Sequence, residues 1–194
     1  MRPSLHYVLY VCRLAGAETQ TTSAERDCIA RYARGKRLAA EIGVWHGVTT
    51  CRIARELAPS GVVYAVDNYR PGAFGFSFQQ RIAQHQTRAY REQVRFVVAN
   101  SETAAAELRK KVGCAFDLVF VDGDHSYEGI ETDWSCWSGM IVPNGIVALH
   151  DSRSTPERNI EDAGSVIFTR EVILNDSRFE LLEQVDSLSV LRRR

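Results

Sequence analysis

The sequence contains little lysine, no paired cysteine motif and no long apolar run, and each absence excludes a class of protein. Three of the 24 basic residues are lysines, and 24 acidic residues balance the basic ones to a net charge of zero. Such a balance provides no strong attraction to nucleic acid or to an anionic membrane surface. No run approaches the roughly 18 apolar residues that a membrane-spanning helix needs. We therefore expect neither a nucleic-acid partner nor a membrane partner.

The five cysteines are odd in number and form no CxxC pair. This pattern supports neither a disulfide framework nor a zinc knuckle, and it is typical of free thiols in a reducing cytoplasm. The apolar stretch at residues 5–12 contains His6 and is followed by Arg13, which makes it a poor match to a signal peptide. We expect a cytoplasmic protein whose residues 1–35 form an N-terminal helical segment packed on the rest.

Short apolar runs alternate with helical patterns along the rest of the chain, which is typical of βαβ units around a parallel sheet. Thr22 and Glu25 have the spacing of a capping box, which predicts a helix to about residue 34. Strands are predicted at 37–42, 62–66, 94–99, 116–121 and 145–149. Helices are predicted at 47–57, 78–92, from 101 onward, at 127–137 and around 166–174.

The last two apolar runs, 179–183 and 187–191, are too close for a helical crossover and should pair antiparallel. The predicted fold class is therefore α/β, with a doubly wound, mostly parallel seven-stranded sheet and a C-terminal antiparallel hairpin. We expect one domain over residues 1–194, in which residues 36–194 form the α/β core.

Four predicted strands end in an acidic residue: Glu41, Asp67, Asp122 and Asp151. A single acid in such a place can simply cap the following helix. Four of them at one edge of a parallel sheet indicate a binding site, because open α/β sheets bind ligands beyond the carboxyl ends of their strands. The acids belong to a wider asymmetry, since residues 121–194 hold 14 acidic but 7 basic side chains.

The turn after the first strand has two glycines four residues apart, Gly43 and Gly47, preceded by Glu41. Glycines there allow a ligand to approach the backbone closely. The turn lacks the middle glycine of GxGxxG, which disfavours a nicotinamide dehydrogenase. Asp67 closes the next strand, where a carboxylate can accept hydrogen bonds from both hydroxyls of a ribose. The two features together predict a nucleotide-type ligand.

An acid followed by GxxxG resembles the first motif of class I S-adenosylmethionine (SAM)-dependent methyltransferases. A second segment, Asp117-Leu-Val-Phe-Val-Asp-Gly-Asp-His-Ser-Tyr-Glu-Gly129, carries two acids and a histidine after a buried strand. Together with Trp134, Trp137, Pro143-Asn-Gly145 and His150-Asp151, it resembles the family of macrolide-sugar O-methyltransferases and cephalosporin-hydroxylase-like proteins. Catechol-type O-methyltransferases are more distant relatives. The resemblance covers about residues 20–192.

The resemblance implies that SAM is the cofactor. The GxxxG turn would pass under its methionine part, Asp67 would hold the ribose, and Asn100 and Ser101 would contact adenine. An N-cap role explains Ser101 nearly as well. The residues expected to bind the cofactor are Glu41, Gly43, Gly47, Thr49, Asp67, Asn68, Asn100, Ser101 and Asp122.

The resemblance also implies that Asp122 and Asp151 bind Mg²⁺ and that His125 takes the proton from the acceptor hydroxyl. Asp122 and His125 are therefore the expected catalytic residues. His150 stands where sugar-modifying relatives have a glutamate, which removes a hard oxygen ligand of the kind that Mg²⁺ prefers. Three alternatives stay open: Mg²⁺ held by two carboxylates and waters, a nitrogen-tolerant ion such as Mn²⁺ with His150 among its ligands, or no metal.

These features predict a SAM-dependent O-methyltransferase, assisted by a divalent metal, that acts on a small hydroxylated metabolite such as a sugar or natural product. The alternatives are a metal-independent methyltransferase that uses His125 as base or methylates nitrogen, and a SAM-binding module without catalysis. A homo-oligomer is possible. Residues 71–78 and 152–162 are expected to form the acceptor walls. Aromatic candidates for them are Trp45, Phe74, Phe76, Phe78 and Tyr127.

Overall fold

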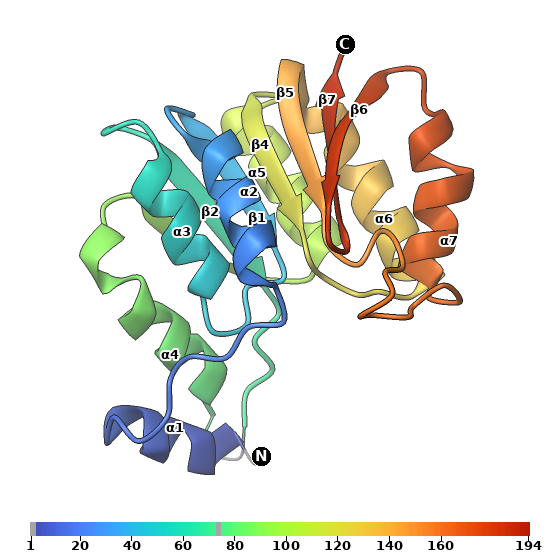
Figure 1. Cartoon of the computed structure of the whole chain (residues 1–194). Helices are drawn as coiled ribbons and strands as arrows, with labels where there is room; N and C mark the ends of the chain where they lie inside the picture. Colours follow the sequence, from blue (N-terminus) through green and yellow to red (C-terminus); the bar gives the residue numbers. More distant parts are fainter. Residues whose placement is uncertain (1–2, 73–74) are drawn as a thin grey trace.

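The computed structural model describes residues 3–72 and 75–194 of the chain. A seven-stranded sheet runs through its centre in the order β3-β2-β1-β4-β5-β7-β6 (Figure 1). Neighbouring strands among the first five pair parallel, and β7 pairs antiparallel with both β5 and β6. This topology confirms the predicted doubly wound sheet with its terminal hairpin. The strands are β1 (Leu38–Ile42), β2 (Val62–Asp67), β3 (Val94–Val98), β4 (Phe116–Val121), β5 (Ile141–Leu149), β6 (Phe179–Val185) and β7 (Leu188–Arg193).

Helices cover both faces of the sheet (Figure 1). On one face, α2 (Ser23–Ala33), α3 (Val48–Glu56) and α4 (Phe78–Gln86) enclose a core that includes Ile29 and Ile53. On the other, α5 (Ser101–Val112), α6 (Tyr127–Trp137) and α7 (Gly164–Glu171) enclose a second core around Phe116 and Trp137. Because both faces are covered, the central strands read as continuous apolar runs, which is why the sequence reveals them.

Two element boundaries differ from the sequence prediction by four residues or more. Helix α4 ends at Gln86 instead of continuing to residue 92, and a 3₁₀ turn (Arg88–Tyr90) follows it. At the end of α4, the backbone N–H and the hydroxyl of Thr87 both donate to the Ala83 carbonyl, at 3.0 and 2.9 Å, and the Tyr90 N–H donates to the Thr87 carbonyl at 2.8 Å in the turn that follows. Strand β5 begins at Ile141, before the predicted residue 145, because Ile141 pairs with Phe116 ahead of a register shift.

Helix α1 (Pro3–Val11) packs against α4, near the edge of the sheet at which the parallel strands end (Figure 1). The buried ring of His6 stacks on His46, with 5.0 Å between the ring centroids. The opposite side of α1 leaves Leu5, Val8 and Val11 exposed, an apolar stripe that the sequence analysis did not predict. In the described part of the chain, no helix is both long and apolar enough to span a membrane.

Candidate functional site

A cavity of about 820 Å³ lies where β1, β2, β3 and β4 end. Its walls come from the turns that follow these strands, from the first turns of α3, α5 and α6, and from residues 18–20. Neither lysine nor arginine occurs among the described residues that line it, whereas eight of them are acidic. The acidic lining residues are Glu18, Glu41, Asp67, Glu102, Asp122, Asp124, Glu128 and Asp133. This uneven charge favours a cationic ligand over a phosphate-bearing one.

Gly43 is required by close backbone packing in the turn after β1. Its φ of +85° is a left-handed conformation, and a Cβ at this position would clash with the main-chain carbonyl of Asp122. The sequence therefore correctly indicates close approach at Gly43, which lines the cavity. Gly47 has φ +73° and faces Ala83 of α4, and it lies outside the cavity lining. A role of Gly47 in cofactor binding stays a prediction.

Asp67 holds this turn in place. Its Oδ2 accepts the backbone N–H groups of Val44 and Trp45, both at 3.0 Å, and its Oδ1 accepts that of Tyr69 at 2.8 Å. Trp45 and Tyr69 both have positive φ, so the carboxylate stabilises a backbone path that such residues rarely adopt. Asp67 also lines the cavity, as does Asn68 beside it. Asp67, the residue predicted to bind the ribose, therefore also holds the turn after β1 in place.

Glu41 is the most deeply buried acid of the cavity wall, at 1% exposure. The hydroxyl of Thr50 donates to it. Burial raises the pKa of Glu41 well above its usual range, and the nearby carboxylates of Asp122 and Asp67 add to this effect. A positive charge on a ligand would relieve the repulsion among these three groups.

The remaining predicted cofactor residues, Thr49, Asn100 and Ser101, also line the cavity. The N-cap of α5 is Asn100, whose Oδ1 accepts the Thr103 N–H at 2.8 Å, so the alternative of Ser101 as N-cap is wrong. Ser101 is the first residue of the helix, and its Oγ accepts a hydrogen bond from Trp137 Nε1 at 2.9 Å.

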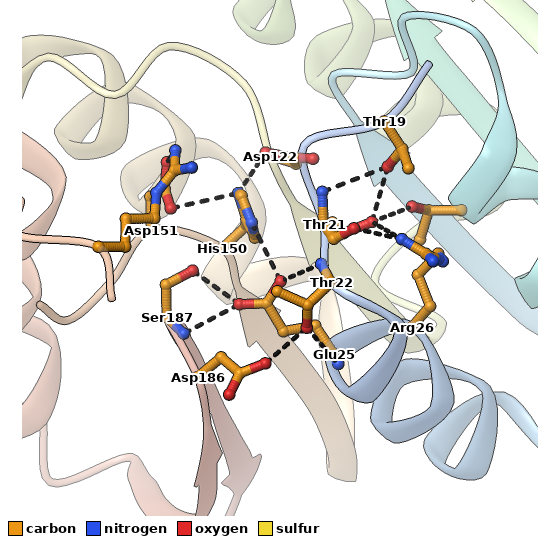
Figure 2. A network of polar contacts seen from close by, with 12 residues as sticks. Thr19, Thr21, Thr22, Glu25, Arg26, Asp122, His150, Asp151, Asp186 and Ser187 are labelled. Carbon is orange, nitrogen blue, oxygen red and sulfur yellow. Dashed lines mark hydrogen bonds and ion pairs between the residues drawn. The ribbon is translucent and has the colours of Figure 1, made fainter. Parts of the chain in front are cut away.

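Behind Asp122 lies His150, a histidine with 3% exposure whose two ring nitrogens each face a carboxylate (Figure 2). Nδ1 is 2.8 Å from Asp122 Oδ1, and Nε2 is 3.4 Å from Glu25 Oε2. Burial alone would lower the pKa of His150, but the carboxylates of Asp122 and Glu25 outweigh it and raise the pKa to about 10. His150 therefore joins the end of β5 to the cavity wall on one side and to α2 on the other.

Glu25 is the centre of the polar network in Figure 2. Its Oε2 accepts the Thr22 N–H at 2.8 Å, which completes the predicted capping box. Its Oε1 accepts both the N–H and the hydroxyl of Ser187, at 2.9 and 2.7 Å. Burial would raise the pKa of Glu25, but the bonds from His150, Thr22 and Ser187 lower it to about 2. The sequence reveals the capping box but not these further partners, because Ser187 lies 162 residues away.

Asp151 follows β5 with a φ of +48° and is 3% exposed. Arg158 Nη2 lies 2.5 Å from its Oδ2. The main-chain carbonyl of Asp151 accepts the hydroxyl of Ser165 at 2.6 Å, which ties the turn to α7. Asp151 and His150 do not line the large cavity but lie directly behind its wall at Asp122. The sequence analysis did not predict that Arg158 pairs with Asp151.

His125 faces the cavity between two of the predicted carboxylates. Its Nε2 is 3.7 Å from Asp122 Oδ1 and 3.7 Å from Asp151 Oδ2, and its side chain is 35% exposed. Its main-chain carbonyl accepts the Ser165 N–H at 3.0 Å, which positions the loop. The structure thus places the two predicted catalytic residues, His125 and Asp122, close together, and both line the cavity.

The donor atoms around Asp122 fit a divalent ion that tolerates nitrogen better than they fit Mg²⁺. Asp151 Oδ1 is buried without a hydrogen-bond partner among the described residues, and it lies 3.7 Å from His150 Nδ1. Ligand atoms of Asp122, His125 and His150 all lie within 4.8 Å of one another. Glu25 faces the far nitrogen of His150, as a carboxylate does behind many metal-binding histidines. Imidazole at this place favours a first-row transition ion, whereas Mg²⁺ prefers oxygen.

Of the aromatic residues proposed for the acceptor walls, Trp45 lines the cavity. Tyr127 packs edge-on against Phe168 of α7, with 5.1 Å between the ring centroids, and Phe78 contacts Tyr7 of α1. Neither lines the cavity, nor do Phe76 and residues 152–162. The prediction for Phe74 falls outside the described residues.

The chain has the architecture of class I methyltransferases. The central strands of its sheet are parallel, an antiparallel hairpin lies at one edge, and the cavity lies beyond the ends of β1 and β4. The sequence of residues 40–152 matches the model of the methyltransferase domain family, over more than half of the chain. The chain belongs to this family, which confirms the predicted resemblance to class I methyltransferases. A closer relationship to the macrolide-sugar branch stays a prediction.

Solved structures of low sequence identity share the whole fold. The O-methyltransferase TomG from Streptomyces achromogenes, solved with SAM, aligns with a TM-score of 0.69 at 14% identity, covering 100% of this chain and 90% of that one. An O-methyltransferase from Bacillus cereus, in complex with S-adenosylhomocysteine, aligns at 0.65 and 16% identity, covering 96% and 87%.

A putative caffeoyl-CoA O-methyltransferase from Staphylococcus aureus aligns with a TM-score of 0.70 at 14% identity, over 100% and 93% of the two chains. Among curated proteins, an uncharacterized protein of Sinorhizobium fredii, y4gI, is 24% identical over 128 residues. That match covers 62% of this chain but 14% of the relative, so the chain spans a small part of its length.

Proposed function

We propose that the protein is a SAM-dependent O-methyltransferase that acts on a small hydroxylated metabolite. The observation that carries the proposal is the placement of His125 at an acid-lined cavity, 3.7 Å from both Asp122 and Asp151. A proton acceptor therefore lies next to a cavity suited to a cation, within the fold of a methyltransferase family.

The cavity suits SAM on the grounds of its charge and of the residues that line it. The sulfonium and the ammonium of SAM are positive, and the methionine end would lie over the turn at Gly43, next to buried Glu41. Asp67, at the end of β2, would accept the ribose hydroxyls. The pyrophosphate of a nicotinamide dinucleotide would meet the same carboxylates unfavourably, which again disfavours a dehydrogenase.

His125 is the residue that would remove the proton from the acceptor. When bound, SAM supplies an electrophilic methyl group on its sulfonium sulfur. A neutral alcohol is a weak nucleophile, so a base within reach of the hydroxyl raises the rate. The ring of His125 is open to the cavity and lies between Asp122 and Asp151, which can stabilise the imidazolium that it becomes. Trp45 lines the same cavity and provides apolar surface there.

The metal-assisted form of the reaction is the one that the donor atoms support. Asp122, His150 and Asp151 would hold an ion such as Mn²⁺ or Zn²⁺. When bound, such an ion lowers the pKa of a coordinated hydroxyl and orients it. The alternative, in which His125 works without metal, has two observations in its favour. Arg158 pairs with Asp151 at 2.5 Å, and the raised pKa of His150, about 10, favours its protonated form, which must lose a proton before it can bind an ion.

The test is a methyl-transfer assay with SAM and a panel of diols, sugars and phenols, read out as release of S-adenosylhomocysteine. We expect turnover on at least one class of acceptor, and His125→Ala should abolish most of it. The exposed His85→Ala serves as a matched control, because His85 lies outside the cavity. S-adenosylhomocysteine binding with no turnover on any acceptor would instead support a module without catalysis.

A further inference from the structure

A second group of metal-ligating side chains lies apart from the residues around Asp122. His6 comes from α1, Glu18 from the segment after α1, and His46 from the turn after β1. One ligand atom of each residue lies within 4.8 Å of the other two. Both histidines are buried, at 4% and 3% exposure, whereas the Glu18 side chain is 45% exposed and lines the cavity. The fold thus brings two imidazoles and a carboxylate together from three separate segments.

The backbone determines which ring nitrogen of His6 can bind a ligand. His6 Nε2 lies 3.1 Å from the main-chain carbonyl of Gly16, which can only accept, so Nε2 carries the hydrogen. In the neutral ring, the lone pair is then on Nδ1. Metal-binding histidines commonly donate their other ring N–H to a backbone carbonyl, which holds the ring in its binding orientation. His6 has this arrangement.

Nδ1 of His6 faces the Glu18 carboxylate at the spacing of two ligands on one ion. It lies 3.3 Å from Glu18 Oε1 and makes no hydrogen bond with the described residues. Two atoms bound at about 2.0–2.1 Å to a tetrahedral ion such as Zn²⁺ are about 3.3 Å apart. Facing lone pairs repel each other unless a proton or a metal ion lies between them. Because the contact lacks the geometry of a hydrogen bond, it favours the ion.

His46 supplies the third donor. Its ring stacks on those of His6 and Trp45, with 5.0 and 4.8 Å between the ring centroids, so it is held beside the other two ligands. Its Nδ1 accepts the Glu18 N–H at 3.0 Å. An ion bound at either ring nitrogen would end this bond, since Nδ1 would then be a ligand itself or carry the hydrogen. One neutral hydrogen bond is a small loss against a bond between metal and nitrogen.

We propose that His6, Glu18 and His46 form a metal site of their own, which binds Zn²⁺ or a similar first-row transition ion. Imidazole ligands favour such ions over Mg²⁺ and Ca²⁺, which prefer oxygen. The ion would join α1 and the segment after it to the turn after β1. Because residues 18–20 line the cavity, the ion would also hold this part of the cavity wall in place. The proposal does not depend on the proposed function.

The experiment is calorimetry of Zn²⁺ binding to the full chain after EDTA treatment, in the His150→Ala variant, which lacks a ligand of the site at Asp122. We expect one Zn²⁺ per chain. Adding Glu18→Gln, which keeps the size of the side chain but removes its charge, should weaken binding by about 10-fold or more. Adding His6→Ala should weaken it by at least about 100-fold, because even the hydrogen-bond partners of metal ligands contribute about 10-fold to 100-fold.

The matched control is His85→Ala. His85 is an exposed histidine that also contacts α1, since its Nδ1 lies 2.7 Å from the Tyr10 hydroxyl. This variant should leave Zn²⁺ affinity unchanged. A loss as large as that in His6→Ala would show that the packing of α1 matters and not coordination, and would overturn the proposal.

Two further results would also overturn the proposal: no Zn²⁺ binding by a chain with all three ligands, or full affinity in both Glu18→Gln and His6→Ala. If His6→Ala does not fold, Glu18→Gln decides, because its side chain is half-exposed and its N–H bond to His46 is unaffected. If His150→Ala does not fold, the same variants are compared in the wild-type background, where His6→Ala should reduce the number of bound Zn²⁺ ions by one. None of these measurements involves SAM or turnover, so the proposed function stands or falls separately.

Discussion

At the scale of single residues, the same carboxylate can build the site and bind the ligand. Asp67 illustrates this, because it accepts two N–H groups of the turn after β1 and also lines the cavity. A hydrogen bond from a backbone N–H to a charged carboxylate contributes about 1.5–3 kcal/mol, and neutralising the carboxylate loses part of this. A change at Asp67 should therefore act on the cofactor through the turn as well as directly.

We predict that Asp67→Asn weakens S-adenosylhomocysteine binding by about 10-fold to 100-fold, because a neutral amide holds the Val44 and Trp45 N–H groups less well. Calorimetry measures the effect. Asp117→Asn is the matched control, since Asp117 also accepts two backbone N–H groups, those of Arg37 and Leu38, at the start of β4. Equal losses of affinity in both variants would show that Asp67 contributes stability alone.

His125 should control the rate without controlling cofactor affinity. We expect His125→Ala to lower kcat by about 10²-fold to 10⁴-fold, the usual contribution of a general base, with S-adenosylhomocysteine affinity unchanged. The residual rate should rise with pH as the acceptor hydroxyl ionises on its own. A variant that keeps most of the wild-type kcat at pH 7 would remove His125 from the mechanism.

The metal proposal depends on His150 and its neighbours. Treatment with EDTA should lower kcat, and Mn²⁺ should restore it better than Mg²⁺, because the buried donor set contains an imidazole. His150→Ala should prevent the restoration. Unchanged turnover in EDTA would eliminate the metal, and Arg158 at Asp151 would then supply the positive charge at this position.

At the scale of elements, the network around Glu25 joins α2, the end of β5 and the turn between β6 and β7. Glu25 links Thr22, His150 and Ser187 through a side chain that is 1% exposed. The pKa of Glu25 falls from 4.5 to about 2 on folding, so its stabilising contribution is complete above pH 4.5 and is lost as the pH falls toward 2. That shift corresponds to a free energy on the order of 3 kcal/mol.

We predict that Glu25→Gln lowers the free energy of unfolding at pH 7 by about 3 kcal/mol, and that the gap to the wild type narrows as the pH drops below 4.5. Urea denaturation at pH 7 and at pH 3.5 measures both values. Glu161→Gln is the control, because it breaks an exposed ion pair with Arg170. It should lower the free energy of unfolding by less than about 1 kcal/mol. A gap that is the same at both pH values would contradict the role given to the Glu25 carboxylate.

The positions of some site residues could be predicted from the sequence, whereas certain long-range contacts and one helix end could not. Strand-end acids such as Asp67 and Asp122 are predictable, because parallel strands place their carboxyl ends at one edge. The contacts of Glu25 and Arg158 could not be predicted in the same way. Ser187 lies 162 residues from Glu25 in the sequence, and the contact between Arg158 and Asp151 depends on the conformation of an irregular loop. The end of α4 at Gln86 was not predicted, because the 3₁₀ turn at Arg88–Tyr90 continues the helical sequence pattern without a glycine or proline to mark the boundary.

At the scale of the whole molecule, a neutral chain concentrates its acids in one place. Eight acidic residues line the cavity, and they come from both parts of the sequence. Glu18 and Glu41 belong to residues 1–120, the part in which basic side chains outnumber acidic ones. The excess of acids after residue 120 therefore explains only part of the charge at the site. The sheet topology, which places β1 between β2 and β4, brings the two sets of acids together.

The proposed function requires that this acidic cavity bind a positively charged nucleoside cofactor. The most direct measurement is calorimetry of the wild-type chain with SAM, S-adenosylhomocysteine and NAD⁺ under identical conditions. We predict that both sulfur-containing ligands bind, that SAM gains affinity at low salt because of its sulfonium, and that NAD⁺ does not bind. Binding of NAD⁺ with no binding of SAM or S-adenosylhomocysteine would contradict the account.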